Sequence, residues 1–397
     1  MNSRAKVRIS VARVNGSCVQ VKSKSSRLHK EKHSYINLNL KEIMSLVPGY
    51  IYFIRERDYL TNQITPYVKI GLTREQRPVS ARLSDHKTAN PREEYSQWDL
   101  AVPMVDKLEK YMHHYFAERR IHGEWFLMDP SEVMTLAVPV VLQMEVEQAA
   151  TKPLLLNKDI LKATLSNGTV RAPTSTETAM HQAYIAADED YKMSNARFTI
   201  KKMELRTMIG TSDGIARKII ILQQKGQPPT LDQVGFLAAL TSAQQALCQT
   251  PSQTSNGTPT ITPGRSLVNL DPVLNTAKKA AVDAAPKSIP VSNKSNPELP
   301  ITQALKDLHM EYLGTMRAVK IAEWEKERTG AELANMLGVD ETITGIITWV
   351  RVAPTTVTKF NNKEAKKQFE RIYNAHLTPN PDIIAVIIDD KHHYAYP

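Results

Sequence analysis

Between residues 48 and 130 the chain contains polar side chains at spacings that would place them together. Side chains alternate across a strand, so Tyr50 and Tyr52 share one face of a first predicted strand. After a polar connection, Lys69 and Gly71 alternate in the same way on a second predicted strand. Two such strands joined by a loop form a hairpin, which would display phenol hydroxyls and an ammonium group side by side.

Two segments with helical spacing follow this hairpin. Arg82 and His86 lie four residues apart, which places them on one face of a helix. In the later segment D-K-L-E-K-Y-M-H-H-Y-F, Glu109 and His113 have the same spacing. The segment ends with G-E-W-F. We therefore expect two strands and two helices to carry a carboxylate, an arginine, two histidines and two tyrosines.

The order of these residues resembles the GIY-YIG nuclease superfamily. Its first half-motif appears as Tyr50-Ile51-Tyr52 and its second as Lys69-Ile70-Gly71. The phage-type branch is the more similar one, because its members read K-I-G, then R-L, then an E-x-x-x-H helix, then G-E-W-F. The resemblance covers residues 48–130, about a fifth of the chain. It implies a small α+β domain with a three-stranded antiparallel sheet and flanking helices, which hydrolyses DNA phosphodiesters with one divalent metal, Mg²⁺ or Mn²⁺.

The resemblance also implies roles for the charged side chains. Glu109 would bind the metal, because hard cations prefer carboxylate oxygen. The metal would neutralise the phosphate and stabilise the leaving oxygen. Arg82 would hold the phosphate through its planar set of donors. The spacing from Gly71 to Arg82 is longer than in compact members, so this assignment depends on R-L and on the following His86.

A tyrosine would act as the general base towards the attacking water. Lys69 stands where the family has its second tyrosine, so the base would be Tyr52, with Tyr50 as the second choice. An unperturbed tyrosine has a pKa near 10, so it needs nearby cations to act at neutral pH. Lys69, the arginine and the metal would supply them. His86 or His113 would relay protons or position the water.

The charge of the chain favours a polyanionic partner. The formal net charge is +10, and residues 1–34 contain nine lysines and arginines but one acidic residue. A basic arm of this kind attracts nucleic acid and speeds the encounter with it. Double-stranded DNA is therefore the predicted partner. A solvated tail that only aids solubility is the alternative.

Composition excludes some other classes of protein. No stretch approaches the roughly 20 apolar residues of a membrane span, so no membrane association is predicted. Cys18 and Cys248 are far apart and fit neither a disulfide framework nor a zinc site. A reducing, cytoplasmic location is expected.

At 397 residues the chain suggests two or three domains. Residues 249–300 are rich in Ser, Thr, Pro and Ala and contain no Phe, Trp or Tyr, so they predict a flexible linker. The other predicted parts are a basic arm with a short strand (1–47), the nuclease-like domain (48–150), and two mainly helical modules (176–248, and 301–397 with a C-terminal strand).

The two helical modules resemble each other when the chain is shifted by 128 positions. Identical residues then coincide, such as His181 with His309, Tyr184 with Tyr312 and Gly210 with Gly338. The shared register predicts a duplication. Each copy has the pattern of a helix-turn-helix, with a first helix, a glycine turn and a second helix that would enter a major groove. The residues expected to contact DNA are Thr342, Thr344 and Arg351 in the later copy and Arg206, Arg217 and Lys218 in the earlier one.

Together these patterns predict a sequence-specific DNA endonuclease of a phage or mobile element, acting on foreign DNA as a monomer or a weak homodimer. One active site cuts one strand per binding event, so nicking or paired cleavage is expected. Three alternatives remain open. The chain could be a DNA-binding regulator with an inactive GIY-YIG-like domain, a protein whose helical hairpins bind another protein, or a nuclease that acts on RNA.

Overall fold

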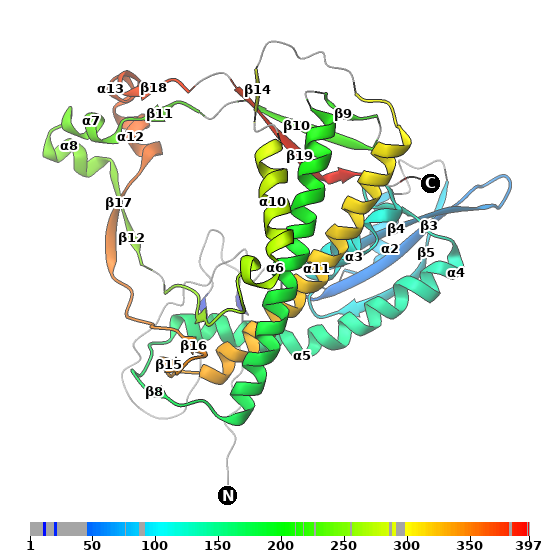
Figure 1. Cartoon of the computed structure of the whole chain (residues 1–397), viewed down its shortest axis with the longest axis horizontal. Coiled ribbons are helices and arrows are strands. Elements are labelled where there is room, and N and C mark those ends of the chain that lie inside the picture. Colours follow the sequence, from blue (N-terminus) through cyan, green and yellow to red (C-terminus); the bar gives the residue numbers. More distant parts are fainter. Residues whose placement is uncertain are drawn as a thin grey trace, which may run out of the picture.

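The computed structural model describes residues 11–12, 20–21, 46–75, 77–86, 92–210, 212–216, 218–225, 228–254, 256–285, 288–290, 298–380, 383–394 and 396. These residues form an α+β structure in which a twisted sheet lies beside two long helices (Figure 1). Most of the basic arm lies outside the described residues. Its described part is the short antiparallel pair of β1 (Val11–Ala12) and β2 (Gln20–Val21).

The N-terminal domain is built on an antiparallel sheet of five strands in the order β5-β3-β4-β7-β6. The sheet has two strands more than the three that were expected. The G-E-W-F segment forms β7, which pairs with β4, and β6 pairs in turn with β7. The strands are β3 (Gly49–Arg57), β4 (Ile64–Arg74), β5 (Glu93–Val102), β6 (Arg120–His122) and β7 (Trp125–Leu127).

Alternation along β3 sends side chains to both faces of the sheet. Ile51 and Phe53 are buried in the main core on one face, whereas Tyr52 and Ile54 pack with Val79 of the first helix on the other. The sheet therefore has helices on both sides. These helical elements are α2 (Val79–His86), α3 (Val105–Tyr115), η1 (Ala117–Arg119), α4 (Pro130–Glu132), the π-helical turn η2 (Val133–Ala137) and α5 (Val138–Ala163).

Two helices of 35 residues, α6 (Ser175–Ile209) and α11 (Gln303–Leu337), pack side by side and run in opposite directions (Figure 1). Each begins after a threonine whose side chain accepts a backbone N–H, and each ends at a glycine with φ near +60°. Short strands follow at the same places, β9 (Gly214–Ile215) and β15 (Thr342–Ile343). The same elements thus recur at the spacing of 128 residues found in the sequence.

The two copies exchange their flanking strands. The strand β8 (Val170–Arg171), which precedes α6, pairs in parallel with β15, which follows α11. Ile215, which follows α6, bridges in parallel to Leu299, which precedes α11. Each copy therefore completes its sheet with residues of the other, and neither copy is a separate module.

The prediction of a second helix in each helix-turn-helix is wrong. After Gly338 the chain forms a hairpin of β15 and β16 (Ile347–Thr348), and after Gly210 it forms β9 and β10 (Ile219–Lys225). The segment T-I-T-G-I-I-T-W-V is rich in β-branched residues, which favour strands, and its central glycine has φ +77°. Ile343, Ile347 and Trp349 pack under α11 instead of facing a groove.

A small helical lobe, formed by residues 228–254 and 355–380, stands away from the helix pair (Figure 1). Its four short helices come from both copies and pack around Phe236, which is fully buried. Two antiparallel ribbons connect it to the rest of the chain. The elements are α7 (Gln233–Ala238), α8 (Ser242–Leu247), α12 (Asn362–Gln368), α13 (Glu370–Ala375), with β11 (Thr230–Leu231) paired to β18 (Leu377–Thr378) and β12 (Gln249–Gln253) paired to β17 (Thr356–Phe360).

In place of a flexible linker, residues 256–285 contain regular elements. Asp188 and Lys192 of α6 hold the backbone of Gly264 from its N–H and its carbonyl, respectively, and α10 packs along α6. The elements here are β13 (Thr260–Ile261), α9 (Leu267–Leu270) and α10 (Pro272–Ala284), and β14 (Ser288–Pro290) pairs with the last strand, β19 (Ile383–His393).

Helix α11 also completes the core of the N-terminal domain. Trp324 and Ala331 are buried in the same cluster as Leu108 and Met112 of α3. The Trp324 indole N–H donates to a carboxylate oxygen of Glu147, at 2.7 Å. The sheet and α11 therefore share one core, whereas α6 contributes its buried residues to other clusters. Among the described helices, none combines the length and the apolar character needed to cross a bilayer.

Candidate active site

A cavity of about 410 Å³ opens on the face of the sheet that α2 partly covers. The structure brings three of the predicted site residues together here: Tyr52 from β3, Arg82 from α2 and Glu109 from α3. The other residues of its wall are Leu72, Thr73, Arg74, Arg77 and Glu124.

Tyr52 lies opposite Gly71 in the β3–β4 ladder, and its ring covers that glycine. Its side chain is 1% exposed, and its hydroxyl accepts a hydrogen bond from the Arg82 guanidinium. Burial raises the pKa of Tyr52 above its ordinary value of 10.0, and Arg82 lowers it by less. Burial therefore outweighs the effect of Arg82 on the pKa of this hydroxyl, and Lys69 is not among the main groups that shift it.

Arg82 is positioned by a hydrogen bond to Tyr52 and by an ion pair with Asp85. Besides the hydrogen bond to Tyr52, which raises the pKa of Arg82 further, its Nη1 lies 3.6 Å from Oδ2 of Asp85. Its guanidinium is partly exposed to the cavity. A fixed, fully ionised guanidinium at this place can bind an oxyanion.

Glu109 lines the same cavity, and the pKa of its carboxyl group is unusually high. Burial raises its pKa to about 7, and the nearby carboxylates of Glu124 and Asp106 add to the effect. A buried carboxylate beside others is stabilised by a cation, so this arrangement fits a divalent metal ion. Mg²⁺ is usually held by one or two carboxylates plus water and substrate phosphate. Within the described ranges, no three His, Cys, Asp or Glu side chains are grouped so that they could hold a metal ion by themselves.

The raised pKa of Glu109 predicts a pH-dependent stability. Below about pH 4.5 the carboxyl is protonated in both the folded and the unfolded chain. Between pH 4.5 and about 7 only the unfolded chain loses the proton, so ionisation destabilises the folded state increasingly. Glu109→Gln removes this penalty, so the variant should gain stability relative to the parent as the pH rises. We expect the difference in free energy of unfolding, variant minus parent, to be about 3 kcal/mol larger at pH 8 than at pH 4.5.

Urea denaturation at the two pH values in the absence of divalent metal measures this difference. Burial lowers the pKa of His113 to about 4, which makes stability rise between pH 4 and 6.5, but this contribution is common to both proteins and cancels. The exposed Glu93, replaced in the same way, is the matched control. An equal difference at both pH values would show that Glu109 titrates normally.

The remaining predicted residues lie around the cavity. The Lys69 ammonium lies 3.5 Å from a carboxylate oxygen of Glu124, and so acts on the site through that glutamate. Tyr50 packs beside Tyr52 and lines a separate cavity next to Gly49. The side chain of His86 lies outside what the structure describes.

His113 has a positioning role. Its Nε2 donates to the carbonyl of Ile70, at 2.8 Å, and its ring lies against Phe126. This bond ties α3 to β4 near Gly71. Because burial keeps the imidazole neutral and its Nε2 is occupied, the structure does not support a proton relay through this nitrogen.

Sequence reasoning missed two arginines of the cavity. Arg74 makes a bidentate pair with Asp106, with its Nη2 2.6 Å from Oδ1, and Arg77 lies 2.5 Å from Oδ2 of Asp85. The strand β4 continues for three residues beyond Gly71. The sequence signal for them is the pair of arginines within six residues of the second half-motif.

The residues predicted to contact DNA through the helical modules do not form one surface. Arg351 is 1% exposed, donates to the backbone carbonyl of Asp340 and stacks on Trp349, so it stabilises the fold. Thr342 bonds to Thr348 across the hairpin, and Thr344 is exposed.

In the earlier copy, the buried Nε of Arg206 has no hydrogen-bond acceptor among the residues that the structure describes, and Lys218 lies over the ring of Tyr396 at 4.6 Å. Arg217 lies outside the described residues. With Arg351 internal and no recognition helix among the described elements, these positions are scattered over several elements.

Comparison with known proteins gives one match. Residues 49–138 match the T5orf172 domain, a phage-associated domain tied to homing and GIY-YIG-like endonucleases. The match covers less than a quarter of the chain and includes every residue of the cavity. No curated protein and no solved structure matches the chain.

Proposed function

We propose that this protein is a DNA endonuclease whose catalytic centre is the cavity with Tyr52, Arg82 and Glu109. The observation that carries the proposal is the convergence of a carboxylate, an arginine and a tyrosine from separate elements, within a stretch that matches a phage-associated domain. Hydrolysis of a phosphodiester requires groups that bind an oxyanion, and this cavity has three arginines in its wall. The expected reaction is cleavage of foreign DNA, either as a nick in one strand or as a paired cut made by two protein molecules.

Each side chain has a task that its surroundings allow. Glu109, with Glu124 beside it, would hold Mg²⁺ or Mn²⁺, which when bound supplies positive charge to the phosphate and the leaving oxygen. Arg82 would hold a non-bridging phosphate oxygen, with Arg74 and Arg77 adding positive charge. The Tyr52 hydroxyl, fixed by Arg82, would orient the attacking water. Its phenolate form, which nearby positive charge would favour, would accept the proton of that water.

A second candidate is a DNA-binding regulator whose nuclease-like domain no longer cuts. Two observations favour it. Lys69 replaces the family's second tyrosine, and burial raises the pKa of Tyr52 away from neutrality. Binding without cleavage would identify this function.

Metal removal separates the two. We expect supercoiled plasmid and phage DNA to be converted to open circles or linear product in the presence of Mg²⁺ or Mn²⁺. EDTA should abolish the conversion, and excess metal should restore it. Several DNA sources are needed, because the target site is unknown and could be rare. Retention of DNA on a gel without any cleavage under all metal conditions would support the regulator.

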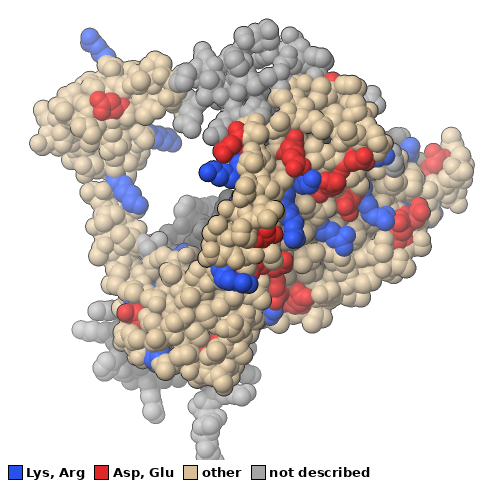
Figure 2. All heavy atoms as spheres, viewed as in Figure 1, with Lys and Arg blue, Asp and Glu red and all other residues tan. Residues whose placement is uncertain are grey.

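DNA contact is proposed for the helical lobe in place of the predicted recognition helices. Its later half carries the exposed side chains of Lys359, Lys363, Lys366, Lys367 and Arg371, and basic side chains project from the lobe in Figure 2. Among the described residues, none of the five has an ion-pair partner. The earlier half has no lysine or arginine. The basic side chains of the lobe therefore all belong to its later half, and they suit contact with a phosphate backbone.

Charge reversal tests this contact. The triple variant Lys363→Glu, Lys366→Glu and Lys367→Glu should weaken binding to duplex DNA and reduce the dependence of log K on log salt by roughly one for each phosphate that the lobe no longer neutralises. Lys279→Glu, on the exposed side of α10, should change neither quantity. An unchanged salt dependence in the triple variant would move the DNA contact elsewhere.

A further inference from the structure

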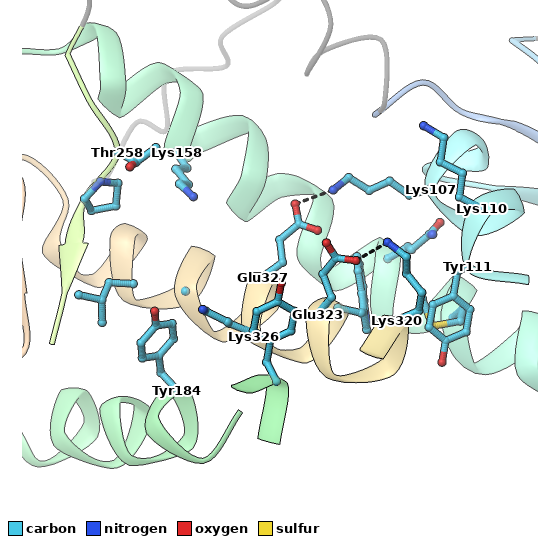
Figure 3. Close-up of a pocket in the computed structure, with 17 residues that line it drawn as sticks. Lys107, Lys110, Tyr111, Lys158, Tyr184, Thr258, Lys320, Glu323, Lys326 and Glu327 are labelled. Carbon is cyan, nitrogen blue, oxygen red and sulfur yellow. Dashed lines mark hydrogen bonds and ion pairs between the residues drawn. The ribbon is translucent and has the colours of Figure 1, made fainter. Parts of the chain in front are cut away.

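A second cavity, of about 640 Å³, lies between α3, α5, α6 and α11, with residues 258–261 closing one side (Figure 3). It shares no residue with the candidate active site. Its volume is within the range of roughly 300–1,000 Å³ that is usual for sites that bind small molecules. The cavity thus lies between the N-terminal domain and the helix pair, and it is large enough for a small-molecule ligand.

The ionisable wall of this cavity is predominantly positive, with five lysines and two glutamates. Lys110 and Lys158 have no ion-pair partner among the residues that the structure describes. Excess ammonium groups on a concave surface attract an anion. The paired lysines are Lys107 with Glu327 at 2.5 Å, Lys320 with Glu323 at 2.5 Å and Lys326 with Asp188 at 2.7 Å.

Aromatic rings form much of the remaining wall. The ammonium of Lys326 lies 4.8 Å from the ring centre of Tyr191, and Tyr184 is nearly buried beside it. In Figure 3 the side chains of Tyr184, Lys326 and Lys158 point toward the same space. The Trp324 indole N–H is already bonded to Glu147, so this ring contributes apolar surface. Rings beside ammonium groups suit a ligand that has both an aromatic ring and a negative charge.

We propose that this cavity binds a nucleotide. Its phosphate oxygens would lie between Lys158 and Lys326, and its base would lie against Tyr184 and Tyr191. The nucleotide has two sources, a free nucleoside triphosphate or one unit of a bound DNA strand. Lys107 and Lys110 are on α3, the helix that also carries Glu109. A nucleotide bound in this cavity would therefore contact the same helix that contributes to the candidate active site. The proposal concerns binding and holds whether or not the protein cleaves DNA.

Calorimetric titration of the full-length protein with ATP, GTP, inorganic triphosphate and a short oligothymidylate tests the proposal without cleavage. We expect a nucleoside triphosphate or the oligonucleotide to bind in a one-to-one ratio. Lys158→Glu should weaken that binding by about tenfold or more, since it replaces an attraction by a repulsion. Lys158→Met keeps the length without the charge and should weaken it less. Lys279→Glu is the matched control and should leave it unchanged.

The aromatic contact is tested separately. Tyr191→Ala should weaken binding of the nucleotide but leave that of inorganic triphosphate unchanged. Tighter binding of ATP or GTP would identify the ligand as a free nucleotide. Tighter binding of oligothymidylate would identify it as one unit of a DNA strand. Absence of binding by all four probes, or binding that Lys158→Glu does not alter, would overturn the proposal. Melting curves of each variant show whether a loss of binding reflects unfolding.

Discussion

Replacing Glu109 by glutamine is expected to reduce DNA cleavage by about a thousandfold or more while leaving DNA binding intact. Glutamine keeps the volume of the side chain but removes the negative charge that a divalent cation requires. No other carboxylate of the cavity wall can compensate fully, because Glu124 is already paired with Lys69, and the neighbouring Asp106 is paired with Arg74. Single-turnover nicking of supercoiled DNA at saturating Mg²⁺, beside a filter-binding assay without metal, measures both quantities.

The pH profile gives the same prediction a second test. Because the pKa of Glu109 is about 7, the parent enzyme at low metal concentration should cut faster as pH rises towards 7 and the carboxylate form becomes available. Residual activity of Glu109→Gln should lack this rise. The exposed Glu93, changed to glutamine, should retain the rate and profile of the parent. A Glu109→Gln protein that cuts within tenfold of the parent would remove Glu109 from the metal site.

Replacing Gly71 by alanine is expected to reduce cleavage by about a hundredfold, although this residue carries no reactive group. A Cβ atom at this position would lie 2.5 Å from the Tyr52 hydroxyl and 2.7 Å from its ring, much closer than such atoms approach. The ring must therefore shift away from the added carbon, and a shift into the neighbouring cavity would move its hydroxyl away from Arg82. Overpacking of this kind also costs stability, about 1–3 kcal/mol.

A double-mutant cycle shows whether the effect acts through the tyrosine. Tyr52→Phe alone should lower the rate, and Gly71→Ala should lower it little further in that background. Gly257→Ala is the matched control, because no atom lies within 4 Å of the added carbon and its backbone is unstrained. An active, fully stable Gly71→Ala protein would mean that the position of Tyr52 does not matter for catalysis.

Local periodicity predicted which side chains share a face, such as Tyr50 and Tyr52 on the first strand. The grouping of Tyr52 with Arg82 and Glu109 came from the resemblance to the GIY-YIG nucleases, which depends on the order of the motifs. The contact between Tyr52 and Gly71 depends on the pairing register of β3 and β4, which the sequence does not specify. The pKa values of Glu109 and His113 depend on burial, and burial is a property of the folded domain.

The two largest differences from expectation have physical causes of another kind. The segment after Gly338 was interpreted by the spacing of its apolar residues, although its isoleucines and threonines favour strands. The segment around Gly264 has few large apolar groups, and composition predicted a linker. Its order comes instead from polar contacts with Asp188 and Lys192 of a distant helix, and contacts of that type are invisible to composition.

Trp324 and Ala331 belong to the core of a domain whose own segment ends about 190 residues earlier, near Val138. Ribosomes add roughly 5–20 residues per second, so about 10–40 s pass after the synthesis of the N-terminal domain before α11 can cover it. During that interval the nascent chain exposes apolar surface around Leu108 and Met112. The N-terminal domain would therefore complete its core only once α11 has emerged from the ribosome.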